Sequence, residues 1–244
     1  IMHHKEDLVN EILHLNIKEV VLENNSDAEF IHLLKNTYGI EVSICSEYLT
    51  EGYENLINDA PNAQVKQGIR HLLYYLVVKE LKDLHHISRV EIVNKNDYLE
   101  MDVHTIRNLE LTETLRLKER TYSLLWLLDK TKTAMGSRKM KFWLTNPLRC
   151  KEEILDRYKK IEIFNTNFMQ MDEARGLLYQ VYDLERLCAK VICGNLNARD
   201  LLQIKNSLSV LPRIKDILGE LKLDYTLNTH DELYDLLNKS IYEN

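Results

Sequence analysis

The chain has 244 residues, 45% hydrophobic and 29% charged, a composition typical of an ordinary globular protein with one large domain or two modest ones. Seven glycines and three prolines are few, which favours long helices and argues against disorder. The net charge of −6 excludes a protein whose main task is to neutralise phosphates. Any DNA contact must therefore be indirect or rest on a local patch.

The first part of the chain has an α/β pattern. Apolar residues at helical spacing predict a helix over residues 6–16, and a short strand follows over 17–22. Residues 40–45 alternate between apolar and polar and predict a second strand. A strand, a helix and a strand in this short compass indicate a parallel βαβ unit with a small sheet.

The helix between these strands has start and stop signals. Ser26 with Glu29 three residues later has the spacing of a capping box, in which each side chain satisfies a backbone N–H group. Gly39 is placed to end the helix, because glycine readily adopts the left-handed conformation that follows a last turn.

The strongest helical pattern follows a connection over residues 52–62, which has Pro61 near its end. A single apolar face extends over five turns and comprises Val65, Ile69, Leu72, Leu73, Leu76, Val77, Leu81 and Leu84. His85 and His86 then lie at the helix end, where imidazolium suits the helix dipole. Adjacent helical residues point about 100° apart, so this pair cannot chelate one ion from a helix.

Beyond this helix, residues 89–93 and 98–101 alternate and predict short extended segments, and after Asp102 the chain is expected to stay helical. Thr133 is a predicted N-cap of a helix that ends at about Thr145, before Asn146-Pro147. Further helices are predicted from near residue 151, from Asn197 with Asp200 in its first turn, and over 231–242.

The sequence has none of the motifs that mark common catalytic sites. It lacks a phosphate-binding loop, a dinucleotide-binding glycine motif, a metalloprotease helix and a nucleophile elbow. Cys45, Cys150, Cys188 and Cys193 are scattered and lack the partners of a zinc site, so we expect buried free thiols. We therefore predict no catalytic, cofactor-binding or metal-binding residue in this chain.

Neither a membrane-spanning run nor a signal peptide is visible. Ile1-Met2-His3-His4 does not resemble a natural start, and an added tag or a cut domain boundary would explain it.

A metal-dependent nuclease is one alternative for a small α/β sheet. Such a site needs several carboxylates that converge at strand ends. Glu23 and Glu47 lie just beyond predicted strands, and Glu41 begins one, but their spacing suits a solvated face equally well.

A basic cluster lies beside aromatic residues in the helix that follows Thr133. Arg138, Lys139 and Lys141 are interleaved with Phe142 and Trp143, a combination that can bind nucleic acid. Core packing is the favoured interpretation, with both rings and the neighbouring residues Met135, Met140 and Leu144 facing buried neighbours while Lys139 and Lys141 stay solvated.

Two long blocks of sequence, in order, carry a family resemblance. The first comprises Met101-Asp102, residues 107–115 (RNLELTETL) and residues 123–138 (SLLWLLDKTKTAMGSR). The second comprises residues 182–187 (YDLERL), Val191, Gly194, Asn195 and residues 197–201 (NARDL). Both blocks closely resemble the core domain of bacterial MutS-type DNA mismatch-repair proteins, and the upstream α/β segment is similar to the end of the family's connector domain.

The resemblance implies a mainly α chain with a small α/β part. Residues 1–88 are then the C-terminal part of an RNase H-like connector without its opening strands, residues 89–102 a join, and residues 103–244 the first helical half of the core. The mismatch-reading, DNA-clamping and ATPase parts of the family are missing from this sequence. We therefore expect an internal fragment that is not itself an enzyme.

The resemblance also implies a role and partners. The parent, meaning the full-length protein of which this chain would be a fragment, would be a cytoplasmic homodimer that binds ATP, magnesium and mismatched double-stranded DNA. Its connector would help to recruit a MutL-type protein. This region would carry conformational signals between mismatch binding and the ATPase. The fragment itself is expected to hold no cofactor and to bind DNA weakly, without contact with a membrane.

The matched residues also have a structural interpretation. Gly136 within a helix costs about 1 kcal/mol relative to alanine, which close packing against another helix would explain. Asp183 and Glu185 suit a helix start, and Arg186 is expected to pair with a carboxylate of a neighbouring helix. A helical interaction module unrelated to repair is the alternative reading of the whole chain.

Overall fold

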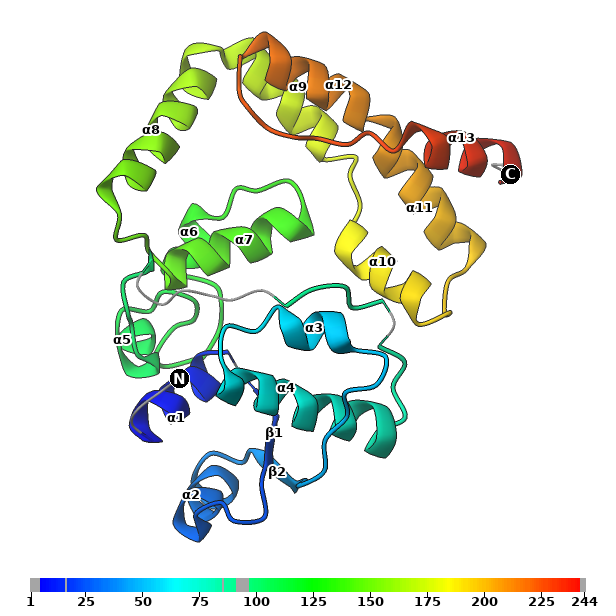
Figure 1. Cartoon of the computed structure of the whole chain (residues 1–244). Coiled ribbons are helices and arrows are strands. Elements are labelled where there is room, and N and C mark those ends of the chain that lie inside the picture. Colours follow the sequence, from blue (N-terminus) through cyan, green and yellow to red (C-terminus); the bar gives the residue numbers. More distant parts are fainter. Residues whose placement is uncertain (1–4, 16, 85, 91–96, 242–244) are drawn as a thin grey trace. The chain divides into compact units, whose positions relative to one another are not determined.

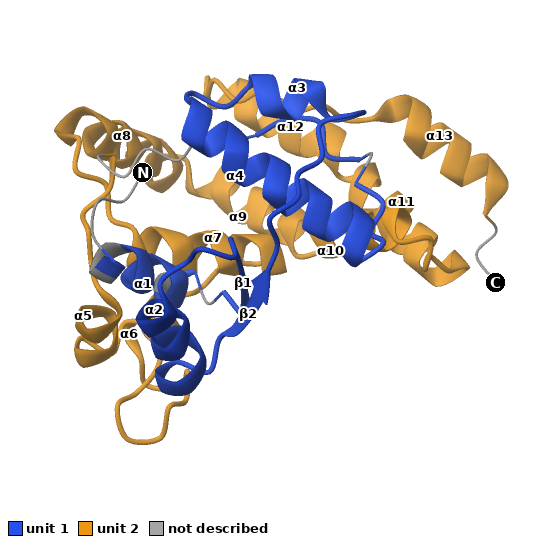
Figure 2. Cartoon of the chain, turned by 60° about the horizontal axis from the view of Figure 1, so that its bottom comes forward, with its two compact units in different colours: residues 1–94 blue, residues 95–244 orange. Residues whose placement is uncertain are grey.

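Helices dominate the chain, as predicted. The computed structural model describes residues 5–15, 17–84, 86–90 and 97–241, and the sheet within them has two strands (Figure 1). Residues 1–94 and 95–244 form two compact units, which are coloured separately in Figure 2. The expected fold class, mainly α with a small α/β part, is confirmed.

The first unit begins with the predicted βαβ pattern. Its elements are α1 (Lys5–His14), β1 (Glu19–Leu22), α2 (Ala28–His32), the π-helical turn η1 (Leu33–Thr37) and β2 (Glu41–Ile44). The strands are parallel, and Val20 of β1 lies opposite Val42 of β2. The apolar faces of the helices and strands meet in one core, formed by Val9, Ile12, Phe30, Leu34, Ile40 and Val42.

The cap of α2 differs from the prediction. Asp27, and not Ser26, is the N-cap, and its carboxylate accepts a hydrogen bond from the backbone N–H of Glu29 at 2.9 Å. A carboxylate also complements the positive end of the helix dipole, which the Ser26 hydroxyl cannot do. Gly39 follows the helical segment at φ +65, as expected of a glycine at a helix end.

The second half of this unit also corrects two predictions. The connection over 52–62 contains a short helix, α3 (Glu54–Asn58). The long predicted helix is shorter: α4 (Ala63–Tyr74) passes into the π-helical turn η2 (Tyr75–Lys79) and stops.

The chain leaves the helix through a left-handed residue, Leu81. It has φ +53 and is 83% exposed, and the next N–H, of Lys82, bonds back to the carbonyl of Leu76 at 2.9 Å. This backward bond closes the helix end. The chain then returns Leu84 to the core of α3 and α4, where it is buried beside Leu73. Leu72, predicted on the apolar face, is 47% exposed.

The second unit is helical. Its elements are α5 (Val103–Asn108), α6 (Leu124–Leu128), α7 (Ala134–Thr145), α8 (Lys151–Thr166), α9 (Phe168–Leu178), α10 (Leu184–Ile192), α11 (Ala198–Ser209), α12 (Leu211–Glu220) and α13 (Asp231–Ser240). The predicted caps at Thr133 and Asn197 are confirmed, and Asn197 with Asp200 forms a full capping box. The helix predicted over 231–242 ends at Ser240.

The expectation of continuous helix after Asp102 is wrong for residues 109–123. This stretch is a loop with left-handed residues at Glu110, Lys118 and Tyr122, three turns that no helix can accommodate. The N–H groups of Leu124 and Leu125 bond back to the carbonyls of residues 110 and 111, at 3.0 and 2.8 Å.

The extended segment at Tyr98 belongs to a small antiparallel pairing. Tyr98 forms a β-bridge with Leu148, and the N–H of Leu99 donates to the carbonyl of Pro147 at 2.7 Å. This pairing ties the strand-like residues before α5 to the segment between α7 and α8. Of the extended segment predicted over residues 89–93, residues 91–93 lie outside the described residues.

Three apolar clusters hold the later helices together. Leu187, Ile204, Leu208 and Leu237 join α10, α11 and α13, and Val181, Val210 and Ile214 form a second cluster beside them. The third contains Ile217, Leu221 and Leu223 at the end of α12, packed against side chains of α8 and α9. Among the described residues, no helix combines the length and apolarity that crossing a membrane requires.

Candidate functional site at the start of helix α7

The loop that leads into α7 is organised around Asp129. Its carboxylate accepts hydrogen bonds from the N–H and the hydroxyl of Thr131, at 3.1 and 2.6 Å, and from the hydroxyl of Ser137 at 2.5 Å. It also pairs with the guanidinium of Arg120. The Asp129 side chain is only 6% exposed, so this one carboxylate joins the loop, the first turn of α7 and the segment before α6.

These contacts control the ionisation of Asp129. Burial, the largest single influence, raises the pKa of the carboxyl group. The hydrogen bonds from Ser137, Thr131 and Arg120 favour the charged form and together outweigh burial, so the pKa falls to about 2. Asp129 is therefore a buried carboxylate that stays charged at neutral pH.

Gly136 packs against this loop and not against a neighbouring helix, which corrects the expectation. The N-cap hydroxyl of Thr133 accepts a hydrogen bond from the Gly136 N–H at 2.9 Å. A Cβ atom on Gly136 would lie 3.0 Å from that hydroxyl oxygen and 3.1 Å from Cβ of Thr131. The glycine thus allows the Asp129 loop to fold back tightly on the first turn of α7.

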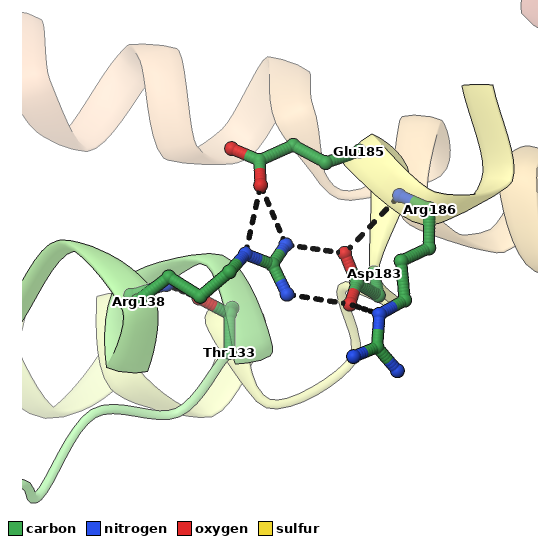
Figure 3. A network of polar contacts seen from close by, with 6 residues as sticks. Thr133, Arg138, Asp183, Glu185 and Arg186 are labelled. Atoms are coloured by element: carbon green, nitrogen blue, oxygen red, sulfur yellow. Dashed lines mark hydrogen bonds and ion pairs between the residues drawn. The ribbon is translucent and has the colours of Figure 1, made fainter. Parts of the chain in front are cut away.

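Arg138, two residues further along α7, reaches the start of α10 (Figure 3). Its two terminal nitrogens donate to the two carboxylate oxygens of Asp183, at 2.9 and 2.6 Å. Its Nε and one terminal nitrogen donate to one oxygen of Glu185, at 2.9 and 2.6 Å. The planar guanidinium matches this bidentate geometry, which an ammonium group cannot reproduce.

The same contacts shift the pKa values of Arg138 and Asp183. Asp183, and next Glu185, raise the pKa of the Arg138 guanidinium, and Arg138 in turn lowers the pKa of Asp183. Asp183 is also the N-cap of α10 and accepts from the N–H of Arg186 at 3.3 Å. The expected pairing of Arg186 with another helix is wrong, because its side chain contacts Asp183 of its own helix start at 3.4 Å.

Polar links of the same kind join the helices that follow. Lys190 of α10 donates to Asp200 of α11 at 2.8 Å and lowers the pKa of that carboxyl group. Arg213 of α12 pairs with Glu173 of α9 through two hydrogen bonds, at 2.7 and 2.9 Å. Each link joins side chains of two helices.

A buried hydroxyl completes the connections of α10. Ser207 of α11 has no exposed surface, and its oxygen accepts a hydrogen bond from the N–H of Tyr182 at 2.9 Å. Its own proton goes to the carbonyl of Gln203 at 2.7 Å. The segment that leads into α10 is therefore held by α11 as well as by Arg138.

The aromatic residues of α7 are more exposed than expected, whereas Lys139 and Lys141 are exposed as predicted. Phe142 and Trp143 are each 39% exposed, so the prediction that both rings face buried neighbours is wrong. Met135, Met140 and Leu144 are half-buried. Met140 and Leu144, four positions apart, lie on one side of the helix, whereas Phe142 points to nearly the opposite side.

The carboxylates considered for a nuclease do not gather into one site. Glu23 contacts Gln67 and His71, each at 3.1 Å, whereas Glu47 contacts His71 through its backbone carbonyl at 2.9 Å. Glu41 lies opposite Glu19 in the strand pairing. Within the described part of the chain, no three His, Cys, Asp or Glu residues are grouped so as to hold a metal ion.

The histidine and cysteine expectations need correction in part. The helix ends before His86, which lies in a turn, while His85, His3 and His4 lie outside the described residues. All four cysteines are free, but Cys45 alone is buried, and the other three are exposed.

The partnership of Arg138 is the feature that sequence reasoning missed. Arg138 and Asp183 are 45 positions apart, and no periodicity connects two residues on different helices. A weak signal was present, because an acidic N-cap and first turn at Asp183 and Glu185 suit a cation as well as the helix dipole.

Comparison with known proteins shows the family to which the chain belongs. Residues 104–244 match the family model of MutS domain III. DNA mismatch repair protein MutS of Bacillus cereus (strain G9842) is 39% identical over 246 residues, which cover 98% of this chain and 28% of that protein. The protein of the same name from Bacillus thuringiensis (strain Al Hakam) has the same identity and coverage. The chain thus spans about 28% of the length of these relatives and belongs to the MutS family of DNA mismatch-repair proteins, with domain III over residues 104–244.

Proposed function

We propose that this chain is a structural and allosteric segment of a mismatch-repair ATPase, and that it couples mismatch binding to ATP hydrolysis without catalysing either step. Coupling requires stiff elements whose arrangement both sites can bias. The helices of the second unit fit this need, because side-chain pairs link α7 to α10, α10 to α11 and α9 to α12.

The observation that carries the proposal is the contact of Arg138 with Asp183 and Glu185. It joins two helix starts through four hydrogen bonds, while Asp129 anchors the loop before the first of them. A displacement of α7 therefore moves α10 or breaks a bidentate pair, and α11 follows through Lys190 and Ser207. Such a chain of contacts is suited to transmission and holds no reactive group.

The domain assignment is part of the proposal. Residues 1–88 would be the C-terminal part of the RNase H-like connector, residues 89–102 the join, and residues 103–244 the first half of the core. The parallel pairing of β1 and β2 beside helices supports the connector assignment.

The parent's partners and cofactors are also proposals. ATP and magnesium would bind to other parts of the parent, which would act in the cytoplasm as a homodimer on mismatched DNA, and the connector would help to recruit a MutL-type protein. The support is that the relatives are named DNA mismatch repair proteins. The family match argues against an interaction module unrelated to repair.

A chimera tests the coupling. In the chimera, this chain replaces the matched region of the Bacillus cereus relative, either unchanged or carrying Arg138→Gln. ATP turnover of each chimera is then measured in the presence and in the absence of mismatched duplex. We expect the variant to keep basal turnover and to lose most of the stimulation by the mismatch. Lys215→Gln, which changes an exposed lysine of α12, is the matched control. Unchanged stimulation in Arg138→Gln would contradict the proposal.

The purified chain tests the absence of catalysis. We expect no ATP turnover and weak binding of mismatched duplex, since the sequence lacks a phosphate-binding loop and carries a net charge of −6. Clear turnover, or tight binding that persists at high salt, would contradict this part of the proposal.

A further inference from the structure

Asp183, the N-cap of α10, faces two guanidinium groups. Arg138 of α7 donates to both of its carboxylate oxygens, at 2.9 and 2.6 Å. Arg186, in the first turn of α10, has its Nε 3.4 Å from one of the same oxygens. The two arginines approach the carboxylate from opposite sides (Figure 3). One carboxylate therefore has two cationic partners, one from another helix and one from its own.

The two partners are unequal in this structure. Arg138 forms a bidentate pair, which is a strong and directional geometry between a guanidinium and a carboxylate. Arg186 forms only a long contact through Nε, and its terminal nitrogens point away from Asp183 (Figure 3). The Arg186 side chain is 82% exposed, so it can turn without disturbing any packing. Arg186 therefore has free donors beside a carboxylate that Arg138 occupies.

The charges of the cluster explain why a second cation matters. Arg138 and Arg186 balance Asp183 and Glu185, so a movement of α7 would leave two carboxylates and one guanidinium at the start of α10. The Asp183 side chain is only 19% exposed, and a carboxylate with so little access to water needs other donors. Arg186 lies within reach, because residues three positions apart are neighbours on a helix surface.

The contact between α7 and α10 can therefore break at a modest cost in free energy. Arg138 and Glu185 are exposed, and ion pairs open to solvent contribute little net stability. A replacement donor at Asp183 lowers the cost further, because the carboxylate is not left unsatisfied. Two arrangements of the same side chains are then close in free energy, as a conformational switch requires.

We propose that Arg186 exchanges with Arg138 at Asp183, so that these three residues form a two-state latch between α7 and α10. In the closed state, Arg138 holds Asp183 and Glu185, as in this structure. In the open state, Arg186 donates to Asp183 through Nε, which already lies beside it, and through a terminal nitrogen. Asp183 still caps α10, and α7 is free to move.

The latch rests on the proposed coupling function, because it names the switching element at the site that this function uses. It adds that α7 can separate from α10 while the first turn of α10 stays folded. Coupling needs an element with two arrangements that both binding events can bias, and a rigid link alone does not provide one.

Hydrogen exchange in the purified chain tests the replacement of one arginine by the other. The buried Leu187 donates its N–H to the carbonyl of Asp183 at 3.0 Å, so its exchange rate reports opening of the first turn of α10. Arg138→Gln and Arg186→Gln are made singly and together. The matched control is Arg199→Gln, alone and with Arg138→Gln, because Arg199 is an exposed arginine in the first turn of α11.

We expect Arg186→Gln alone to change the Leu187 exchange rate by less than about threefold, because Arg138 still holds Asp183. Added to Arg138→Gln, the same substitution should raise the rate at least about tenfold, because Asp183 then lacks both partners. Arg199→Gln should have little effect in either background. Equal effects of Arg186→Gln in the two backgrounds would show that the arginines act independently and would overturn the proposal.

A second measurement needs only the single variant Arg138→Gln, and it serves if the double variant does not fold. The Nε–H group of Arg186 gives an NMR signal that is identified by its loss in Arg186→Gln. In Arg138→Gln we expect this proton to exchange with water at least about fivefold more slowly than in the unsubstituted chain, since it then lies in a bidentate pair. An unchanged or faster rate would overturn the exchange of partners.

Both measurements use the isolated chain without nucleotide or DNA. Their failure would remove the latch and leave the coupling role standing. The coupling role fails separately, if Arg138→Gln leaves the mismatch stimulation of the chimera unchanged.

Discussion

Asp129 shows how one buried carboxylate can organise a loop. Its hydrogen bonds with Thr131 and Ser137 and its ion pair with Arg120 replace the water that burial removes. The cost of desolvation is therefore offset by donors from three separate segments. The carboxylate acts as a structural anchor, and the contacts that hold it account for its strongly shifted pKa.

Asp129 should make stability depend on acid. Its pKa is lowered from 3.8 to about 2, so the stabilisation of roughly 2 kcal/mol is fully present above pH 4 and is lost as the pH falls through 2. We expect Asp129→Asn to be less stable than the unsubstituted chain at neutral pH. The difference should shrink near pH 2, as measured by urea unfolding at a series of pH values.

Asp216→Asn, at an exposed position on α12, is the control for this experiment. It should leave the pH profile unchanged. If the unfolding free energies of the unsubstituted chain and Asp129→Asn differ by a constant amount down to pH 2, the carboxylate charge does not contribute to stability.

Ser207 offers a second test at the level of one side chain. Ser207→Ala removes the acceptor of the Tyr182 N–H and leaves that buried donor unsatisfied. We expect a loss of about 1–3 kcal/mol in the free energy of unfolding. Ser209→Ala, which removes a hydroxyl bonded to the carbonyl of Asn206 on the exposed side of the same helix, should cost much less. Similar losses in both variants would show that the Tyr182 contact contributes little.

At the level of elements, α7 combines three kinds of contact. Gly136 packs against the preceding loop, Arg138 reaches α10, and Lys139 and Trp143 are exposed. The N-cap at Thr133 fixes where the helix begins and thus the direction in which each side points. A shift of one residue at the cap would move Arg138 away from Asp183.

Gly136 should therefore resist substitution. Alanine normally stabilises a helix interior by about 1 kcal/mol relative to glycine. At position 136 its Cβ atom would meet Cβ of Thr131 at 3.1 Å, and that atom is fixed by the Asp129 loop. We expect Gly136→Ala to lower the melting temperature.

Two other helical glycines are matched controls. An added Cβ atom at Gly176 of α9 or Gly219 of α12 meets nothing within 4 Å. Alanine at either position should raise the melting temperature. If Gly136→Ala stabilises the chain as much as these controls do, the loop is not packed tightly against α7.

At the level of the whole molecule, different kinds of contact stabilise the interior of each unit. The first unit depends on two apolar cores around a small parallel sheet. The second adds side-chain ion pairs between helices to its three apolar clusters. These pairs join named turns of neighbouring helices, α7 with α10 and α10 with α11.

The cysteines test the burial pattern of the whole chain. Cys150, Cys188 and Cys193 are exposed, whereas Cys45 is 3% exposed. We expect three thiols of the native chain to react rapidly with a thiol reagent and the fourth to react only after unfolding. Cys45→Ser should remove the slow thiol and keep the three fast ones. Four equally fast thiols would contradict the packing of β2.

The sequence by itself determined part of the local structure. The caps at Thr133 and Asn197 and the parallel pairing of β1 with β2 were predictable, since they depend on residues close in the chain and on hydrophobic period. The stop at Leu81 was not, because no residue type there signals a left-handed turn.

Only the tertiary structure decided the candidate site. The partners of Arg138 come from a helix 45 positions away, and whether Phe142 and Trp143 are buried depends on what packs over them. Periodicity separates a polar face from an apolar one, but it cannot say which neighbour covers an aromatic ring or meets a charge. That depends on how distant segments pack together.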